Sequence, residues 1–378
     1  MTETWFCPDR LFDGETVRDG LALHVVDGHA AGVVPAGQVP ADSIRVPGIV
    51  SPGFIDLQVN GGGGVLLNAT PTVEGMERIA EAHRALGTVG ILPTVITDAP
   101  EVLDQAVAAA LAAKGRPGLL GLHIEGPHIS VPRRGTHASA HVRPFDPATL
   151  EHVRRLRAAD IPVMITLAPE AASPQDIAAL AGTGAVVSIG HSDASAEETR
   201  TALEAGASCF THLFNAMSPM LNRAPGVVGA AINSTAHAGI IADGIHVADE
   251  MIALALRARP VPNRMFLVSD AMPTVGGPDQ FSLYGQDLRL QDGRLVNSEG
   301  SLAGAHLTQA MGVARLVNVL GLDPDEALKM ALTVPARLIG RDDLTKIEGR
   351  ALGDLIVLDA EMHHAGSLVD RLPATVRA

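Results

Sequence analysis

The chain of 378 residues is poor in several residue types, and each shortage argues against a class of protein. It has two cysteines, Cys7 and Cys209, so we expect no disulfide framework. We therefore expect a cytoplasmic location. Aromatic residues make up 3% of the chain, too few for the base-stacking platforms of nucleic-acid binders. Lysine and arginine total 28 against 42 acidic residues, and the net charge of -14 also argues against a nucleic-acid partner.

Long apolar runs are also missing. Charged residues, glycine or proline interrupt each apolar stretch before it reaches the length of a membrane span, so no membrane association is expected. The first residues, MTETWFCPDR, lack a basic region followed by an apolar core, so we expect no signal peptide. The chain is 47% hydrophobic and 19% charged, which suits one large globular domain, alone or with a small one.

Short apolar runs alternate with Ala/Leu/Glu-rich stretches of helical pattern along most of the chain. The runs cover residues 49–59, 88–95, 119–125, 161–167, 185–190, 207–212, 237–242 and 265–270. The helical stretches cover residues 73–86, 101–113, 147–158, 173–181, 194–205, 249–258 and 308–319. This alternation predicts parallel βα units, and eight strands are the number that closes a (β/α)8 TIM-type barrel. A doubly wound open sheet is the alternative.

Both ends of the chain have a different pattern. Asp27 and Gly28 separate two apolar runs, which predicts a β-hairpin. Residues 350–360, RALGDLIVLDA, predict another short strand near the C-terminus.

Polar residues follow several of the eight runs at the point where each strand should end. The set comprises Glu125, His191, His212 and Asp270. In a (β/α)8 barrel these ends share one rim, where catalytic residues gather. Glu125 with the two histidines is a three-ligand set that leaves a coordination position open, as in hydrolytic zinc sites. Taken singly, each residue has a simpler interpretation as a hydrogen-bonded structural group or a capping carboxylate.

The first of the eight runs ends in two amides, in the stretch SPGFIDLQVNGGGG (residues 51–64). Gln58 and Asn60 are two residues apart, so on a strand their side chains point the same way. The glycines that follow allow the backbone to turn tightly beside a pocket, and they lack the lysine of a phosphate-binding P-loop. Loop capping by the two amides is the simpler alternative.

An ordered set of motifs resembles the N-acetylglucosamine-6-phosphate deacetylases, a family of the amidohydrolase superfamily. The motifs are PGFIDLQVNGGGG, LGLHIEGPHIS, RGTHASA, IGHSDAS, THLFNAM, RAPGVVGA, IIADGIHV, LVSDAM and GSLAGAHLT. The resemblance implies a catalytic barrel over residues 49–344 and a small β-sandwich domain built from residues 1–48 and 345–378. It also implies a homodimer.

The resemblance bears on the two amides. Many amidohydrolases carry His-x-His at the end of the first strand to hold one metal of a pair, whereas this chain has Gln58 and Asn60. Amides bind transition metals less well than imidazole does, and one branch of the family has Gln-x-Asn and uses a single metal. The fourth run also has no lysine that could bridge two ions. One divalent ion, Zn²⁺, is therefore expected on Glu125, His191 and His212, with the two amides orienting water or substrate.

The resemblance also assigns catalytic and substrate-binding roles. Asp270 is the general base and then the general acid, and His137 donates a hydrogen bond to the developing oxyanion. The expected contacts to the sugar phosphate are Arg223, His246, Asn215 and Ala216 at the phosphate, and Leu302, Ala303 and Gly304 near the sugar. The implied reaction is hydrolysis of N-acetylglucosamine 6-phosphate to glucosamine 6-phosphate and acetate.

Two other functions remain open at this point. One is deacetylation of a related N-acylated amino sugar, such as N-acetylgalactosamine 6-phosphate. The other is a barrel that binds a sugar phosphate without catalysing a reaction. The joint presence of the metal set and Asp270 argues against the second.

Overall fold

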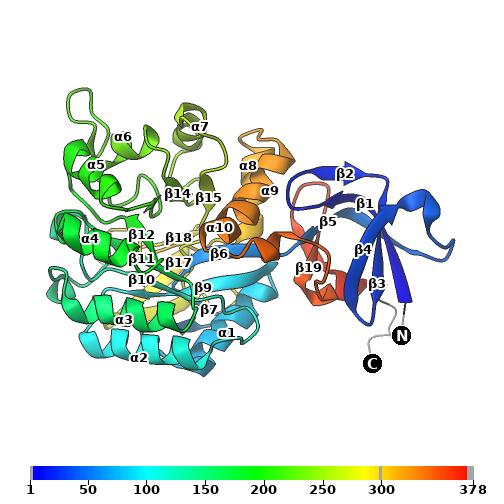
Figure 1. The fold of residues 1–378 in the computed structure, drawn as a ribbon, viewed down its shortest axis with the longest axis horizontal. Coiled ribbons are helices and arrows are strands. Elements are labelled where there is room, and N and C mark those ends of the chain that lie inside the picture. The colour runs from blue at the N-terminus through cyan, green and yellow to red at the C-terminus, as the bar shows by residue number, and fades with distance from the viewer. Residues whose placement is uncertain (1–2, 298–299, 373–378) are drawn as a thin grey trace.

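A computed structural model of the chain describes residues 3–297 and 300–372. It contains a (β/α)8 barrel and, beside it, a smaller sheet to which both ends of the chain contribute (Figure 1). This confirms the fold class that the alternation of runs predicts. Within the described residues, no helix is long and apolar enough to cross a bilayer.

The barrel is an eight-stranded parallel sheet, and each of the eight apolar runs overlaps one of its strands. In chain order the strands are β6 (Phe54–Val59), β9 (Thr88–Ile96), β10 (Leu122–Glu125), β11 (Val163–Leu167), β12 (Val186–Ile189), β13 (Cys209–Phe210), β14 (His237–Ile240) and β15 (Met265–Leu267). Their residues are almost all buried, because helices cover the outside of the sheet and side chains fill its interior. Such strands read as continuous apolar runs rather than as alternating patterns.

The helices form the outer layer of the barrel (Figure 1). They are α1 (Val73–Arg84), α2 (Pro100–Ala112), α3 (Pro147–Ala158), α4 (Pro174–Ala181), α5 (Ala196–Glu204), α6 (Gly226–Ile232), α7 (Asp249–Ala258), α8 (Gln309–Asn318), α9 (Pro324–Ala331) and α10 (Thr333–Leu338). Several begin at side-chain caps. Ser173 and Ser195 each form a capping box with the acidic residue three positions later, and Asp146 accepts a hydrogen bond from Thr149 N.

The first and last barrel strands meet at a seam with little regular pairing. An isolated bridge joins Val59 to Ala271, beyond the end of β15. Backbone hydrogen bonds run from Asp270 N to Gln58 O (3.0 Å) and from Asn60 N to Ala271 O (3.0 Å). The seam therefore holds Gln58, Asn60 and Asp270 in a fixed register at the rim.

The smaller sheet has seven strands. They are β1 (Glu3–Phe12), β2 (Val17–Asp19), β3 (Leu21–Val26), β4 (His29–Pro35), β5 (Ile44–Pro52), β19 (Leu355–Leu358) and β20 (His364–Ser367), in the order β20-β19-β5-β1-β3-β4 with β2 beside β1. The hairpin expected at Asp27 and Gly28 is the turn between β3 and β4. Of the residues expected in the small domain, 1–2 and 373–378 lie outside the described part of the chain.

The first apolar run divides between the two sheets. β5 continues to Pro52 in the smaller sheet, beyond the expected boundary at residue 48, and β6 begins at Phe54 in the barrel. Gly53 lies between them, and a Cβ atom there would come within 2.3 Å of the Val89 side chain. A glycine lets the chain pass from one sheet to the other close to the barrel wall.

Two small antiparallel sheets near the rim were not anticipated from the sequence. β7 (Gly61–Gly62) pairs with β8 (Val65–Leu66), and β16 (Gln280–Leu283), β17 (Gln286–Gln291) and β18 (Arg294–Leu295) form a three-stranded sheet after the last barrel strand. The three-stranded sheet contributes Leu283, Leu288 and Leu295 to a separate apolar cluster, which also contains Ile96 from β9. This cluster fixes the inserted sheet against the barrel.

Candidate active site

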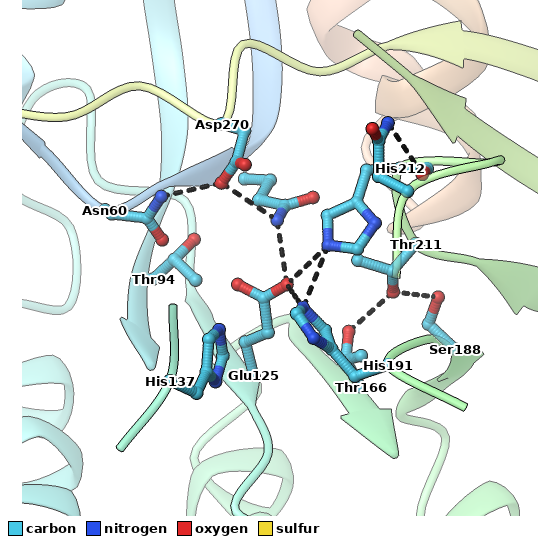
Figure 2. Close-up of polar contacts among 12 residues, drawn as sticks. Asn60, Thr94, Glu125, His137, Thr166, Ser188, His191, Thr211, His212 and Asp270 are labelled. Atoms are coloured by element: carbon cyan, nitrogen blue, oxygen red, sulfur yellow. Dashed lines mark hydrogen bonds and ion pairs between the residues drawn. The ribbon is translucent and has the colours of Figure 1, made fainter. Parts of the chain in front are cut away.

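The predicted rim residues come together at the carboxyl ends of the barrel strands (Figure 2). Glu125 is the last residue of β10, His191 and His212 follow β12 and β13, and Asp270 follows β15. The backbone φ angles of the last three are positive, at 48°, 28° and 51°. Side chains other than glycine rarely adopt this conformation, and such strain is concentrated at functional sites.

Glu125, His191 and His212 present three ligand atoms to one point. Glu125 Oε1 lies 3.2 Å from His191 Nε2 and 3.0 Å from His212 Nε2, and the two imidazole nitrogens are 3.1 Å apart. All three residues are buried, and the group fits a bound metal ion. Two imidazole nitrogens and one carboxylate oxygen are a donor set suited to a divalent transition metal.

Hydrogen bonds and charges within this group shift the pKa values of Glu125 and His212 in opposite directions. Burial alone would raise the pKa of Glu125, but hydrogen bonds and charge from His191 and His212 lower the pKa well below its usual value. Burial likewise opposes protonation of His212, yet the carboxylate of Glu125 raises the pKa of that imidazole. A negatively charged carboxylate beside two imidazoles is the electrostatic setting that a cation requires.

The loop after β10 fixes the orientation of His191. His191 Nδ1 donates a hydrogen bond to the backbone carbonyl of Arg133 (2.9 Å), and Ser130 N donates to His191 O (2.8 Å). The Arg133 side chain also pairs with Asp193, at 2.7 Å. With Nδ1 protonated, Nε2 of His191 carries the lone pair that faces Glu125 and His212.

The side-chain amides of Gln58 and Asn60 donate hydrogen bonds to two carboxylates of the site. Gln58 Nε2 donates to Glu125 Oε1 (3.0 Å) and to Asp270 Oδ1 (3.1 Å), and Asn60 Nδ2 donates to Asp270 Oδ1 (2.7 Å). Burial and the nearby charge of Glu125 raise the pKa of Asp270, whereas the hydrogen bond from Asn60 lowers it. Gln58 therefore links a metal-set carboxylate to the carboxyl group expected to carry the proton.

His137 lies beside the metal set. Its ring centroid is 4.4 Å from that of His191, and its Nδ1 is 2.8 Å from Thr97 Oγ1. Burial, and then the charge of His191, lower the pKa of His137 to about 3, so its imidazole is neutral. A neutral imidazole can donate one hydrogen bond without adding a positive charge beside the metal set.

A chain of hydroxyl groups lies among the inward-facing side chains of the neighbouring strands (Figure 2). Thr211 Oγ1 is 2.6 Å from Thr166 Oγ1 and 2.7 Å from Ser188 Oγ, and Thr166 Oγ1 is 2.7 Å from His123 Nε2. Burial lowers the pKa of His123 to about 4. Both ring nitrogens of His123 face threonine hydroxyl groups, of Thr94 (3.4 Å) and Thr166 (2.7 Å), so this residue belongs to the polar interior of the barrel.

A cavity of about 360 Å³ opens above these groups. Of the predicted site residues, the structure places Asn60, Glu125, His137, His191, His212, Asn215, Ala216, His246, Asp270, Leu302 and Gly304 in its lining. Gln58, Arg223 and Ala303 are not in the lining. Gln58 lies behind the carboxylates, Ala303 is fully buried in the apolar cluster under the inserted sheet, and Arg223 is exposed.

The lining also contains residues that sequence reasoning did not select, including Arg133, Thr136 and Met272. The sequence contains a signal that could have identified Arg133 as a site residue. It is one of two consecutive arginines just before His137, and a negatively charged substrate requires cations. Thr136 and Met272 had no such signal beyond their nearness to other site residues.

His246 has a defined partner at the far side of the cavity. Its Nδ1 is 2.6 Å from Asp243 Oδ2, and Asp243 Oδ1 accepts hydrogen bonds from the backbone N–H groups of Ile245 and His246, both at 2.8 Å. Those hydrogen bonds lower the pKa of Asp243 against the effect of burial. The carboxylate of Asp243 therefore accepts a hydrogen bond from Nδ1 of His246 and fixes the orientation of this imidazole.

The fold and the site define a hydrolase of the metal-dependent barrel type. A model of the amidohydrolase family matches residues 49–376, and the chain belongs to this family. It is 42% identical to the N-acetylgalactosamine-6-phosphate deacetylase of Shewanella sp. (strain ANA-3), over 81% of this chain and 78% of that protein. It is 32% identical to the N-acetylglucosamine-6-phosphate deacetylase of Haemophilus influenzae, over 85% of both chains.

A solved structure agrees. The crystal structure of N-acetylglucosamine-6-phosphate deacetylase from Pasteurella multocida superimposes with a TM-score of 0.89 at 33% identity, and the match covers 97% of this chain and 98% of that one. The likeness extends over both the barrel and the smaller sheet. The protein is therefore a hydrolytic enzyme, as the resemblance in the sequence implies.

Proposed function

We propose that the protein hydrolyses the acetamide of N-acetylglucosamine 6-phosphate, releasing glucosamine 6-phosphate and acetate. The observation that carries this proposal is the arrangement around one cavity of a metal-binding set, Asp270 and His137, with His246 on the same lining. The named activities of the Haemophilus relative and of the Pasteurella enzyme support it, and the Shewanella relative is named for deacetylation of the galactosamine epimer.

We propose one Zn²⁺ ion per subunit, held by Glu125, His191 and His212. A bound divalent ion of this kind lowers the pKa of water and polarises a carbonyl group. Gln58 and Asn60 occupy the positions where a second metal would need imidazoles, and both amide nitrogens donate to carboxylates. Amides in that arrangement leave a single three-residue set at this rim.

Asp270 moves the protons in the proposed reaction. Its carboxylate lines the cavity and removes a proton from the attacking water, and then delivers that proton to the nitrogen of the departing amine. The second transfer is essential because an unprotonated amine is a poor leaving group. Gln58 and Asn60 both donate to Oδ1 of Asp270, so they hold the carboxylate in one orientation during both transfers.

His137 stabilises the charge that develops on the acetamide oxygen. It lies on the cavity lining and is neutral, so it acts as a hydrogen-bond donor from one ring nitrogen. A donor that is already in place before the reaction contributes without reorganising.

The phosphate end of the substrate requires positive charge on an acidic protein. We propose that His246, paired with Asp243, and Asn215 with the backbone of Ala216 bind the phosphate. Arg223, exposed and outside the lining, reaches a bound phosphate only if its loop shifts or if it belongs to a second subunit. The second possibility agrees with the homodimer that we propose. We also propose a cytoplasmic location, in keeping with the two free, buried cysteines.

A second substrate stays in consideration because the relative with 42% identity is named for the galactosamine epimer. The test is to measure kcat/KM for the 6-phosphates of N-acetylglucosamine and N-acetylgalactosamine side by side, following acetate release. We expect the glucosamine epimer to be preferred. A preference of tenfold or more for the galactosamine epimer would assign the second activity, and no acetate release from either would overturn both.

A further inference from the structure

Thr97 contacts both His137 and the backbone of Glu125 and takes no part in the chemistry described above. It directly follows β9 and is 1% exposed. Its Oγ1 is 2.8 Å from His137 Nδ1 and 3.4 Å from the backbone carbonyl oxygen of Glu125. The single hydroxyl proton of Thr97 therefore has two acceptors within reach, and the one it selects decides the state of His137.

The state in question is the imidazole tautomer. A neutral histidine has one N–H group, so a proton on Nδ1 leaves Nε2 as an acceptor, and a proton on Nε2 leaves Nδ1 as an acceptor. If Nδ1 of His137 donated to Thr97 Oγ1, Nε2 would repel a substrate carbonyl oxygen. Donation to that oxygen requires the Nε2–H tautomer, with Nδ1 accepting the hydroxyl proton of Thr97.

The distances favour the productive tautomer. A separation of 2.8 Å is optimal for a hydroxyl hydrogen bond, whereas 3.4 Å lies beyond the usual range. We infer that the Thr97 hydroxyl donates to His137 Nδ1 and selects the Nε2–H tautomer, which makes Thr97 a positioning residue for the oxyanion donor. The oxyanion role of His137 rests on the proposed function; the tautomer does not.

The surroundings of Thr97 fix the place of its hydroxyl. The only tyrosine of the chain, Tyr284, donates from its hydroxyl to the backbone carbonyl of Thr97 (2.5 Å). Tyr284 lies in the turn between β16 and β17, so the inserted sheet contributes a hydrogen bond that holds the backbone of Thr97. At Gly126, whose φ is 77°, a Cβ atom would lie 2.2 Å from Thr97 Oγ1, so any other residue there would displace the hydroxyl.

The direct test reads the tautomer. In protein labelled with nitrogen-15 histidine, the chemical shifts of the two ring nitrogens of His137 distinguish a protonated from an unprotonated nitrogen. We expect an unprotonated Nδ1 in the wild type and in Thr97→Ser, which keeps the hydroxyl, and a mixture of tautomers in Thr97→Val, which has nearly the same shape. The matched control is Thr94→Val, because Thr94 is a buried threonine of β9, the strand that Thr97 follows, and its hydroxyl contacts Val59 N rather than His137. The control should leave the His137 signals unchanged.

The kinetic test separates a role through His137 from general structural damage. Thr97→Val should lower kcat about 10- to 100-fold and leave KM nearly unchanged, because part of the effect of one oxyanion donor is lost. Thr97→Ser should retain most of the rate. In a His137→Gln background Thr97→Val should cause no further loss, because Thr97 then has no imidazole to orient.

Two results would overturn the inference. One is an unchanged His137 tautomer in Thr97→Val. The other is a loss from Thr97→Val that simply adds to the loss from His137→Gln. If the wild type releases no acetate from any amino sugar phosphate, the proposed function fails, while the nitrogen-15 measurement still decides the tautomer.

Discussion

The seam between the first and last barrel strands contains a buried carboxyl group, that of Asp56. Asp56 is fully buried, and its oxygens accept hydrogen bonds from Gln58 N (3.1 Å) and from Ser269 N (3.2 and 3.3 Å). Burial raises the pKa of Asp56 to about 7, although these hydrogen bonds and one from Gln309 lower it.

This raised pKa predicts a specific loss of stability with pH. In the unfolded chain the carboxyl titrates at 3.8, and in the folded chain it titrates at about 7, so the folded state holds the extra proton between these values. The contribution of Asp56 is therefore fully present below about pH 4 and is lost as the pH rises through about 7. At about 1.4 kcal/mol per unit, the unfolding free energy should fall by roughly 4 kcal/mol across this window.

Asp56→Asn tests this sign and size. The amide keeps the shape and retains one acceptor for the two N–H groups. Urea unfolding should show the variant gaining stability relative to the wild type as the pH rises, by about 3 kcal/mol between about pH 5 and pH 8. Asp19→Asn, at an exposed site on β2, is the matched control and should show no such trend. A stability difference between Asp56→Asn and the wild type that does not change with pH would refute the reasoning.

The other predictions concern the active site. Asp270→Asn should keep the fold and the metal but lower kcat about 10²–10⁴-fold, because an amide cannot take the proton; a variant with most of its rate would remove Asp270 from the mechanism. Elemental analysis should find one divalent ion per chain, lost in Glu125→Ala; two ions, both needed for turnover, would contradict the single set. Arg223→Ala should lower kcat/KM about 10-fold or more on the phosphorylated sugar and leave the free sugar unaffected, so equal losses on both would indicate a structural role. In the same comparison, Asp243→Asn should raise KM several-fold for the phosphorylated sugar alone, because His246 loses its charged partner.

The sequence was sufficient to predict the barrel and the meeting of Glu125, His191 and His212 at one rim, for a physical reason. Parallel strands covered on both faces read as apolar runs, and the end of each run falls on one rim, so the topology alone brings Glu125, His191 and His212 together. The helix caps also depend on residues that are close in the sequence, since Ser173 and Ser195 each lie three residues before their acidic partners.

The features that could not be predicted depend on contacts between distant parts of the chain. Gln58 donates to Asp270, which is 212 positions away, and no local pattern shows which way an amide turns. The inserted strands of residues 280–295 have alternating polar residues, yet only their packing on Ile96 shows that they cover the rim. Ala303 and Arg223 lie in motifs of the family, but one is buried and the other exposed, and neither lines the cavity.

The strained backbone at the rim bears on how the site works. Each left-handed residue other than glycine costs about 1 kcal/mol, and His191, His212 and Asp270 all have positive φ. Their backbones are held by hydrogen bonds from other segments, from Ser130 N to His191 O and from Ala305 N to Asp270 O (2.9 Å). Strain maintained in this way places the ligand atoms and the carboxylate before a substrate arrives. Substitutions in the loops that hold these backbones, including the one carrying Ser130, should therefore affect catalysis more strongly than they affect folding.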